Sequence, residues 1–130
     1  MRACLTDMTG MRIVDLSHVQ HIYVAVGRTD MRCGIDKLAS IVQGKFQLDP
    51  CANAIFLFGG RRNDRFKALY WDEDGFLLLY KRLERGKFQW PKDTEQLREI
   101  SFPQFAWLMD GLCVDQPKAH KPLKGRMLFV

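Results

Sequence analysis

The chain has 130 residues, enough for one folded domain with little room for a second, which excludes most multi-domain enzymes. Hydrophobic residues make up 47% and charged residues 27% of it, an ordinary globular composition that supports a core and excludes global disorder. The 20 Lys and Arg residues outnumber the 15 Asp and Glu residues, and the resulting charge of +5 favours polyanionic partners without proving one.

No targeting or membrane segment is predicted. The N-terminal sequence has no continuous apolar stretch of signal-peptide length, because Asp7 and Asp15 interrupt it. The longest apolar runs, 54–58 and 76–80, are far shorter than the roughly 20 residues that span a bilayer. We therefore expect a soluble, cytoplasmic protein that does not contact a membrane.

The first half of the chain predicts a strand, a helix and a second strand. Residues 21–26 (HIYVAV) are typical of a short strand. A helix is expected next, because apolar residues recur at helical spacing: Ile35, Leu38, Ala39, Val42 and Phe46. Thr29 or Asp30 is the expected helix cap. Residues 54–58 are apolar on both faces and predict a strand in the middle of a sheet.

Two turn signals, Asp74-Gly75 and Arg85-Gly86, predict a three-stranded meander over residues 66–90. With two-residue loops, Trp71 lies opposite Leu78. One face then collects the residues expected in the core: Phe66, Ala68, Tyr70, Leu77, Leu79, Leu83, Phe88 and Trp90. The other face is mixed and is either covered or exposed: Lys67, Leu69, Trp71, Leu78, Tyr80, Arg82 and Gln89.

The last third predicts one short helix and a basic tail. Residues 92–99 are polar and indicate a linker or a frayed helix. Ser101 to Gln104 matches a capping box, and an apolar helical stripe follows: Phe105, Leu108, Met109 and Leu112. We expect an α+β fold with a small, mostly antiparallel sheet packed with two helices. Residues 1–20 would be an N-terminal extension, 21–114 the single domain and 115–130 the basic tail.

Positive charge is concentrated in the meander and in the tail: residues 59–92 hold nine basic and five acidic groups, and residues 115–130 hold four and one. Two clusters are candidate phosphate-binding groups, the first entering the meander and the second around its later turn: Arg61, Arg62, Arg65 and Lys67, then Lys81, Arg82, Arg85 and Lys87. The alternative is a solvated rim that protects an antiparallel edge from aggregation.

No residue spacing indicates a catalytic or metal site. His18 and His21 lie in an extended segment without a Cys, Asp or Glu at ligand spacing. The Gly59-Gly60 pair lacks the strand-to-helix context and the lysine of a phosphate loop and indicates a turn. We therefore expect no enzymatic activity, metal, cofactor or small-molecule substrate.

Three segments carry a resemblance to a known family: TDMRCGIDKL (29–38), DPCANAIFLF (49–58) and RRNDRFKALYWDEDGFLLLYKRLERGKFQWP (61–91). In the same order, over roughly residues 22–112, the chain resembles the TnpB-type accessory proteins of the insertion-sequence sixty-six family of bacterial transposons, which are unrelated to the RNA-guided nuclease of that name. Asn63 departs from the pattern, where a basic residue is expected. The resemblance implies a cytoplasmic bacterial protein, encoded beside a transposase and another small accessory protein, that supports transposition.

Two functions follow as hypotheses. In the first, the eight basic residues of the meander bind DNA phosphates, and Trp71 or Tyr80 stacks on a distorted base. In the second, the face with Leu69 and Leu78 docks on the transposase or the sibling accessory protein, and Trp71 and Tyr80 are the partner-binding anchors. A third possibility is that the second helix covers this face, burying Leu69 and Leu78.

Overall fold

The computed structural model describes residues 4–6, 12–92 and 96–116. The elements, in chain order, are β1 (Cys4–Thr6), β2 (Arg12–Asp15), β3 (His21–Ala25), α1 (Ile35–Gly44), β4 (Ala54–Gly59), β5 (Arg65–Trp71), β6 (Phe76–Arg82), β7 (Leu97–Ile100) and α2 (Phe102–Met109). β1 and β2 form an antiparallel pair, and the other five strands form one sheet in the order β6-β5-β4-β3-β7. β3 and β4 run parallel, whereas the remaining neighbours run antiparallel. The expected α+β fold is confirmed.

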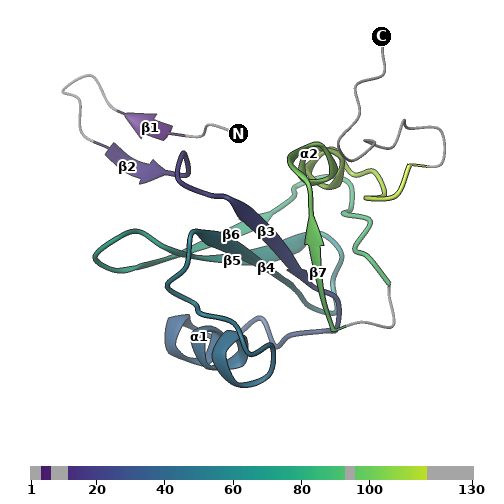
Figure 1. Cartoon of the computed structure of the whole chain (residues 1–130). Coiled ribbons are helices and arrows are strands. Elements are labelled where there is room, and N and C mark those ends of the chain that lie inside the picture. The colour runs from purple at the N-terminus through teal and green to yellow at the C-terminus, as the bar shows by residue number, and fades with distance from the viewer. Residues whose placement is uncertain (1–3, 7–11, 93–95, 117–130) are drawn as a thin grey trace, which may run out of the picture.

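The two helices lie on opposite faces of the five-stranded sheet (Figure 1). α1 makes the crossover between the parallel strands β3 and β4, as such a connection requires. Neither described helix has the length and apolar run needed to traverse a bilayer. Because side chains alternate along a strand, each central strand supplies both layers of the core.

The α1 face buries Phe56, Phe58 and Leu69 of the sheet against Leu38 and Val42 of the helix. Leu78 packs against the same cluster and is partly buried. The mixed face of the predicted meander is therefore partly covered, but the expectation that the second helix covers it is wrong. α1 covers it, because the β3–α1–β4 crossover places this helix there.

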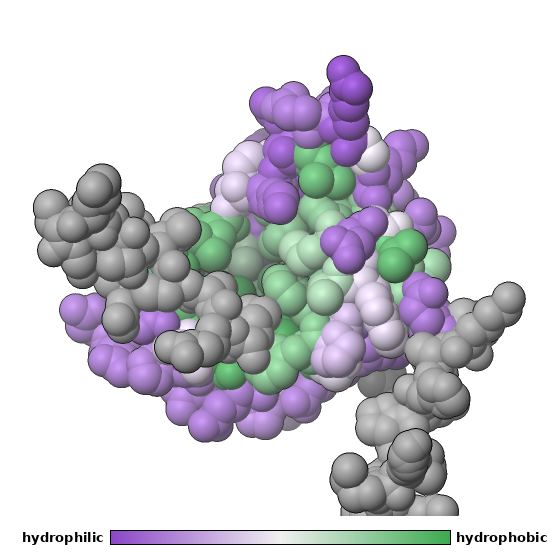
Figure 2. All heavy atoms as spheres, turned by 90° about the horizontal axis from the view of Figure 1, so that it is seen from above, coloured by the Kyte–Doolittle hydropathy of each residue, from purple (hydrophilic) through white to green (hydrophobic). Residues whose placement is uncertain are grey.

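The α2 face contains the predicted meander core. Every member of that set joins one cluster with Leu108 of α2, although Leu77 and Leu79 of the edge strand are only partly buried. Viewed from this side, hydrophobic residues gather in a central hollow ringed by hydrophilic ones (Figure 2). The capping box is also confirmed: the Ser101 hydroxyl accepts from the Gln104 amide at 3.2 Å, and the Gln104 side chain accepts from the Ser101 amide at 2.8 Å.

The β5–β6 hairpin differs from its predicted register by two residues. Trp71 lies opposite Phe76, and Leu69 opposite Leu78, because the loop spans residues 72–75 instead of two residues. Glu73 has a φ of 59°, and the Asp72 amide donates to the Gly75 carbonyl at 2.7 Å. A shift of two keeps each side chain on its predicted face, since the strand period is also two.

The prediction of a third meander strand is also wrong. Residues 83–92 contain no strand; instead the Leu83 amide donates to the Asp64 carbonyl and the Phe88 amide to the Asn63 carbonyl, each at 2.6 Å. The position at the other edge is filled by β7, which pairs with β3, so the linker or frayed helix predicted over residues 92–99 is wrong from residue 97 onward. The backbone of β3 is thereby paired on both sides, which a buried strand requires.

The predicted cap of α1 is wrong as well. Gly34 stands at the N-cap without a side-chain hydrogen bond. Asp30 caps the preceding turn instead, where its Oδ1 accepts from the Arg32 amide at 2.9 Å. Because α1 begins later than predicted, residues 26–34 form a loop between β3 and α1 at the end of the sheet.

Gly59 allows the Trp90 indole to close over the ends of β3 and β4. A Cβ on Gly59 would lie 2.7 Å from Trp90 Cε2, and Trp90 Nε1 donates to the Ala25 carbonyl at 2.9 Å.

We predict that Gly59→Ala lowers the free energy of unfolding by about 2 kcal/mol through overpacking. Urea denaturation measures this, with Gly27→Ala as control, because a Cβ at Gly27 meets nothing within 4 Å. Equal stability of the two variants would contradict the packing argument.

Candidate functional site

The sheet topology brings several basic loops to one end of the sheet. β3 and β4 are parallel and end together, and β5, antiparallel to β4, begins where β4 ends. β6 ends beside the start of β5, with Arg82 opposite Arg65. The acidic hairpin turn at residues 72–74 lies at the opposite end of β5 and β6. The sheet therefore has a cationic end and an acidic end.

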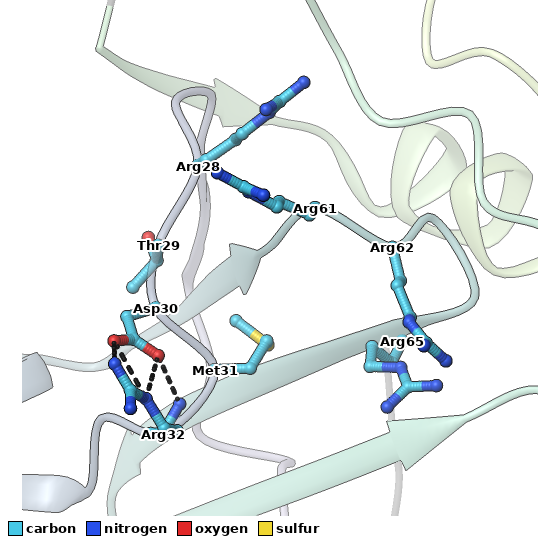
Figure 3. Close-up of a pocket in the computed structure, with 8 residues that line it drawn as sticks. All are labelled: Arg28, Thr29, Asp30, Met31, Arg32, Arg61, Arg62 and Arg65. Carbon is cyan, nitrogen blue, oxygen red and sulfur yellow. Dashed lines mark hydrogen bonds and ion pairs between the residues drawn. The ribbon is translucent and has the colours of Figure 1, made fainter.

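Five arginines line one open depression of about 640 Å³ at the cationic end (Figure 3). Its lining, which we call the arginine depression, comes from the β3–α1 loop and from the connection between β4 and β5: Arg28, Thr29, Asp30, Met31, Arg32, Arg61, Arg62 and Arg65. Met31 projects between the two loops, whereas the arginines stand around it. The depression is within the size range of ligand sites in proteins.

Glycine at two successive positions holds the two loops together. The Thr29 amide donates to the Gly59 carbonyl at 2.8 Å. A Cβ on Gly60 would lie 2.8 Å from Met31 Cγ and 3.2 Å from the Thr29 carbonyl oxygen. Only a bare backbone permits this approach, so Gly59 and Gly60 join the two halves of the depression. The turn predicted at Gly59-Gly60 is wrong, because Gly59 is the last paired residue of β4 and the chain turns at residues 61–64.

Arg32 and Asp30 form a bidentate pair on the rim. Arg32 Nη2 and Nε donate to Asp30 Oδ2 and Oδ1 at 2.8 and 3.1 Å. These hydrogen bonds, with that of the Arg32 amide, lower the pKa of the Asp30 carboxyl to about 2. Lys67 steadies the same loop from β5, since its Nζ donates to the Cys33 carbonyl at 3.0 Å.

Arg65 is positioned by two neighbours. Its Nε donates to Asp64 Oδ1 at 2.8 Å, and its Nη1 donates to the Tyr80 hydroxyl at 3.3 Å. The hydrogen bond to Asp64 raises the pKa of Arg65 further and lowers that of Asp64. Arg65 therefore stays charged at any accessible pH, and its side chain is only 20% exposed.

The other three arginines of the depression have no such partner. Within the described residues no carboxylate lies within 4 Å of Arg28, Arg61 or Arg62, and all three are exposed. Asp30 and Asp64 are each already hydrogen-bonded to an arginine. The depression therefore keeps an uncompensated positive charge, which suits an anionic ligand.

The structure brings only some of the predicted basic residues together. Three of the eight line the depression, namely Arg61, Arg62 and Arg65. Arg82 lies directly opposite Arg65 and pairs with Glu84 at 3.6 Å. Lys67 is engaged with the β3–α1 loop. The remaining three are exposed and do not line it: Lys81, Arg85 and Lys87.

Sequence reasoning missed two arginines of the site, Arg28 and Arg32. Both follow the predicted strand at 21–26. Ligand-binding loops gather at the carboxyl ends of parallel strands, so the position of these arginines after a strand was the signal that could have identified them. Parallel pairing of β3 with β4 could not be read from the pattern, because a mostly antiparallel sheet was expected. The predicted aromatic anchors are separated: Trp71 packs edge-on against Phe76 near the acidic turn, whereas Tyr80 lies beside Arg65.

The two histidines within the described residues lie near carboxylates. His21 Nδ1 lies 2.7 Å from Glu99 Oε2, and His18 Nε2 lies 3.9 Å from Glu73 Oε1. Among the described residues, no group of three or more His, Cys, Asp or Glu side chains could hold a metal ion.

Arg32 is the main cause of the low Asp30 pKa, which makes the rim pair testable. We predict that Arg32→Gln raises the pKa of Asp30 from about 2 towards its ordinary 3.8, as followed by carboxyl chemical shifts in an NMR titration. Because the folded-state pKa is the lower one, the pair stabilises the fold above about pH 4 and loses this contribution as the pH falls towards 2. Arg28→Gln is the control, since Arg28 makes no contact with Asp30; an unchanged pKa in Arg32→Gln would contradict the assignment.

Comparison with known proteins identifies the family. The model of the family described as "IS66 Orf2 like protein" matches residues 20–119. Two relatives come from Sinorhizobium fredii (strain NBRC 101917 / NGR234): uncharacterized protein y4hO is 38% identical over 91 residues, 70% of this chain and 79% of that protein, and uncharacterized protein y4jC is 36% identical over 103 residues, 79% and 87%. No solved structure matches the chain. The family match covers most of the chain and confirms the resemblance noted in its motifs: the protein belongs to the IS66 Orf2-like family of insertion-sequence accessory proteins.

Proposed function

We propose that this protein supports transposition in the cytoplasm by binding DNA phosphates at the cationic end of its sheet, without catalysing a reaction itself. The observation that carries the proposal is the arginine depression, which Arg28, Arg61 and Arg62 line as exposed residues with no carboxylate within 4 Å among the described residues. Guanidinium groups are suited to phosphate, because their planar donors match its oxygens.

Three further basic residues would extend this surface. Arg82 lies next to Arg65 across the β5–β6 pair, and Arg85 and Lys87 follow β6 in an exposed segment tied to Asn63. These groups would contact the backbone of a longer duplex on either side of the depression. Such contacts position a protein on DNA and contribute no base specificity.

Salt dependence tests the proposal. In a titration of a fluorescent duplex at several salt concentrations, we expect the logarithm of affinity to fall linearly with the logarithm of salt for the unmodified protein. Arg61→Ala/Arg62→Ala should weaken binding and reduce the slope by about 1.8, because each lost phosphate contact removes about 0.9.

The control is Lys37→Ala/Lys45→Ala, which removes two exposed positive charges at α1, outside the arginine depression. Both double variants have the same net charge, so a difference between them reports position instead of overall charge. If the two variants behave alike, the arginine depression is not a phosphate site.

Docking to the transposase or to the sibling accessory protein is a second candidate, and Tyr80 favours it. Its side chain is held by the Arg65 guanidinium and by Lys67, whose Nζ lies 5.6 Å from the ring centre, yet 51% of Tyr80 is exposed. An ordered, exposed aromatic next to an arginine is a common anchor at protein interfaces.

The two functions separate by mutation. If docking is the function, Tyr80→Ala should abolish co-purification with the co-encoded transposase or the sibling accessory protein while the thermal unfolding midpoint stays near that of the unmodified protein. Arg61→Ala, which leaves the Arg65–Tyr80 contact in place, should weaken duplex binding and leave co-purification unchanged. Retained co-purification in Tyr80→Ala would remove the docking candidate.

A further inference from the structure

Two further depressions continue from the arginine depression along the described surface. The second, of about 230 Å³, shares Arg28 and Arg61 with the first and reaches the segment 89–92. The third, of about 360 Å³, shares that segment with the second and ends at Arg98 and the residues after α2. Arg28 and Arg61 line both of the first two depressions, and we call this boundary the Arg28–Arg61 ridge. Residues 89–92 likewise line both the second and the third depression and form the ridge between them.

The second depression differs in chemistry from the first. Its walls include the Trp90 ring and two side-chain amides, those of Asn63 and Gln89. Trp90 is partly buried, and its indole N–H is already donated to the Ala25 carbonyl, so the ring contributes carbon atoms to this wall. Asn63 and Gln89 are exposed, and an amide both donates and accepts hydrogen bonds. A cationic ridge thus borders a small hollow with a ring surface and uncharged polar groups.

We propose that these depressions bind single-stranded DNA, with phosphates on the Arg28–Arg61 ridge and in the arginine depression and one unpaired base in the second depression. This inference rests on the proposed function and specifies its ligand. Cationic grooves interleaved with ring surfaces are the usual means of binding a single strand. In a duplex the bases are stacked and paired inside the helix, and a base enters a pocket only when it leaves the stack.

The third depression shares Lys92 with the second, and the charged residues that it adds to this path are Arg98 and Asp115. Arg98 Nη1 donates to Asp115 Oδ2 at 2.9 Å, so the guanidinium and the carboxylate offset each other. Lys92, on the ridge between the second and third depressions, is the next exposed cation. The strand would therefore be held by phosphates mainly at the Arg28–Arg61 side.

Substitution of the two amides separates base contacts from phosphate contacts. Asn63→Ala/Gln89→Ala leaves the ridge arginines and the main chain unchanged, because the Asn63 carbonyl, and not its side chain, accepts from the Phe88 amide. By fluorescence anisotropy, we expect this variant to bind a mixed-sequence single-stranded oligonucleotide about tenfold more weakly, the loss of about two hydrogen bonds. Its affinity for a blunt hairpin duplex with the same number of phosphates should stay unchanged.

Three comparisons complete the experiment. Gln43→Ala/Asn53→Ala, at two exposed positions that line none of the three depressions, should bind both DNAs as the unmodified protein does. An abasic oligonucleotide of equal length should lose affinity for the unmodified protein and show no further loss with Asn63→Ala/Gln89→Ala. Thermal unfolding of each variant checks that the fold is intact.

The outcomes distinguish the inference from the function beneath it. Equal affinity of the amide variant and the unmodified protein for the single strand, or tighter binding of the duplex, would overturn the single-strand inference while leaving phosphate binding in place. Tighter binding of the matching RNA strand would overturn the assignment to DNA. Failure of every nucleic acid to bind would overturn the proposed function itself.

Discussion

The close approach of two loops over bare backbone is the constraint on which the site depends. Gly59 accepts the Trp90 indole against its Cα, and Gly60 accepts Met31 and the Thr29 carbonyl. A side chain at Gly59 would displace the Trp90 indole, and one at Gly60 would push Met31 and the Thr29 carbonyl, and with them the loop that carries Arg28, away from the end of β4. The same two residues therefore close the core below and assemble the cationic surface above.

Five arginines around one depression repel one another, and two carboxylates at the rim reduce this repulsion for two of them. Asp30 and Asp64 each take up one arginine at the rim, so that Arg32 and Arg65 are ordered and locally neutralised. The remaining repulsion between Arg28, Arg61 and Arg62 is moderated by their exposure to solvent and salt. An anionic ligand that enters the depression removes this repulsion, which makes the arrangement favourable for binding.

The polarity of the sheet explains why the basic residues of the sequence gather as far as they do. Arg61 to Arg65 join β4 to β5, so they must lie at the end where β3 also finishes, and Arg82 is brought there by the hairpin. Lys67, two residues into β5, already lies along the strand and serves the neighbouring loop. Basic residues that are close in the sequence are therefore also close in space where they belong to the connection between β4 and β5. Those that lie along a strand, such as Lys67, are directed elsewhere.

By itself the sequence determined the elements with strong local signals: the strands predicted at 21–26 and 54–58 and found at 21–25 and 54–59, the α1 stripe, the α2 capping box and the apolar face of the hairpin. These depend on neighbours in the chain, and period-two alternation preserved the face even where the loop length was wrong. Only the tertiary structure decided the parallel pairing of β3 with β4, the strand at 97–100 and the helix that covers Leu69. Each of these depends on residues far apart in the chain, as does the convergence of Arg28 with Arg61, because pairing energies between distant segments leave no periodic trace in the sequence of either one.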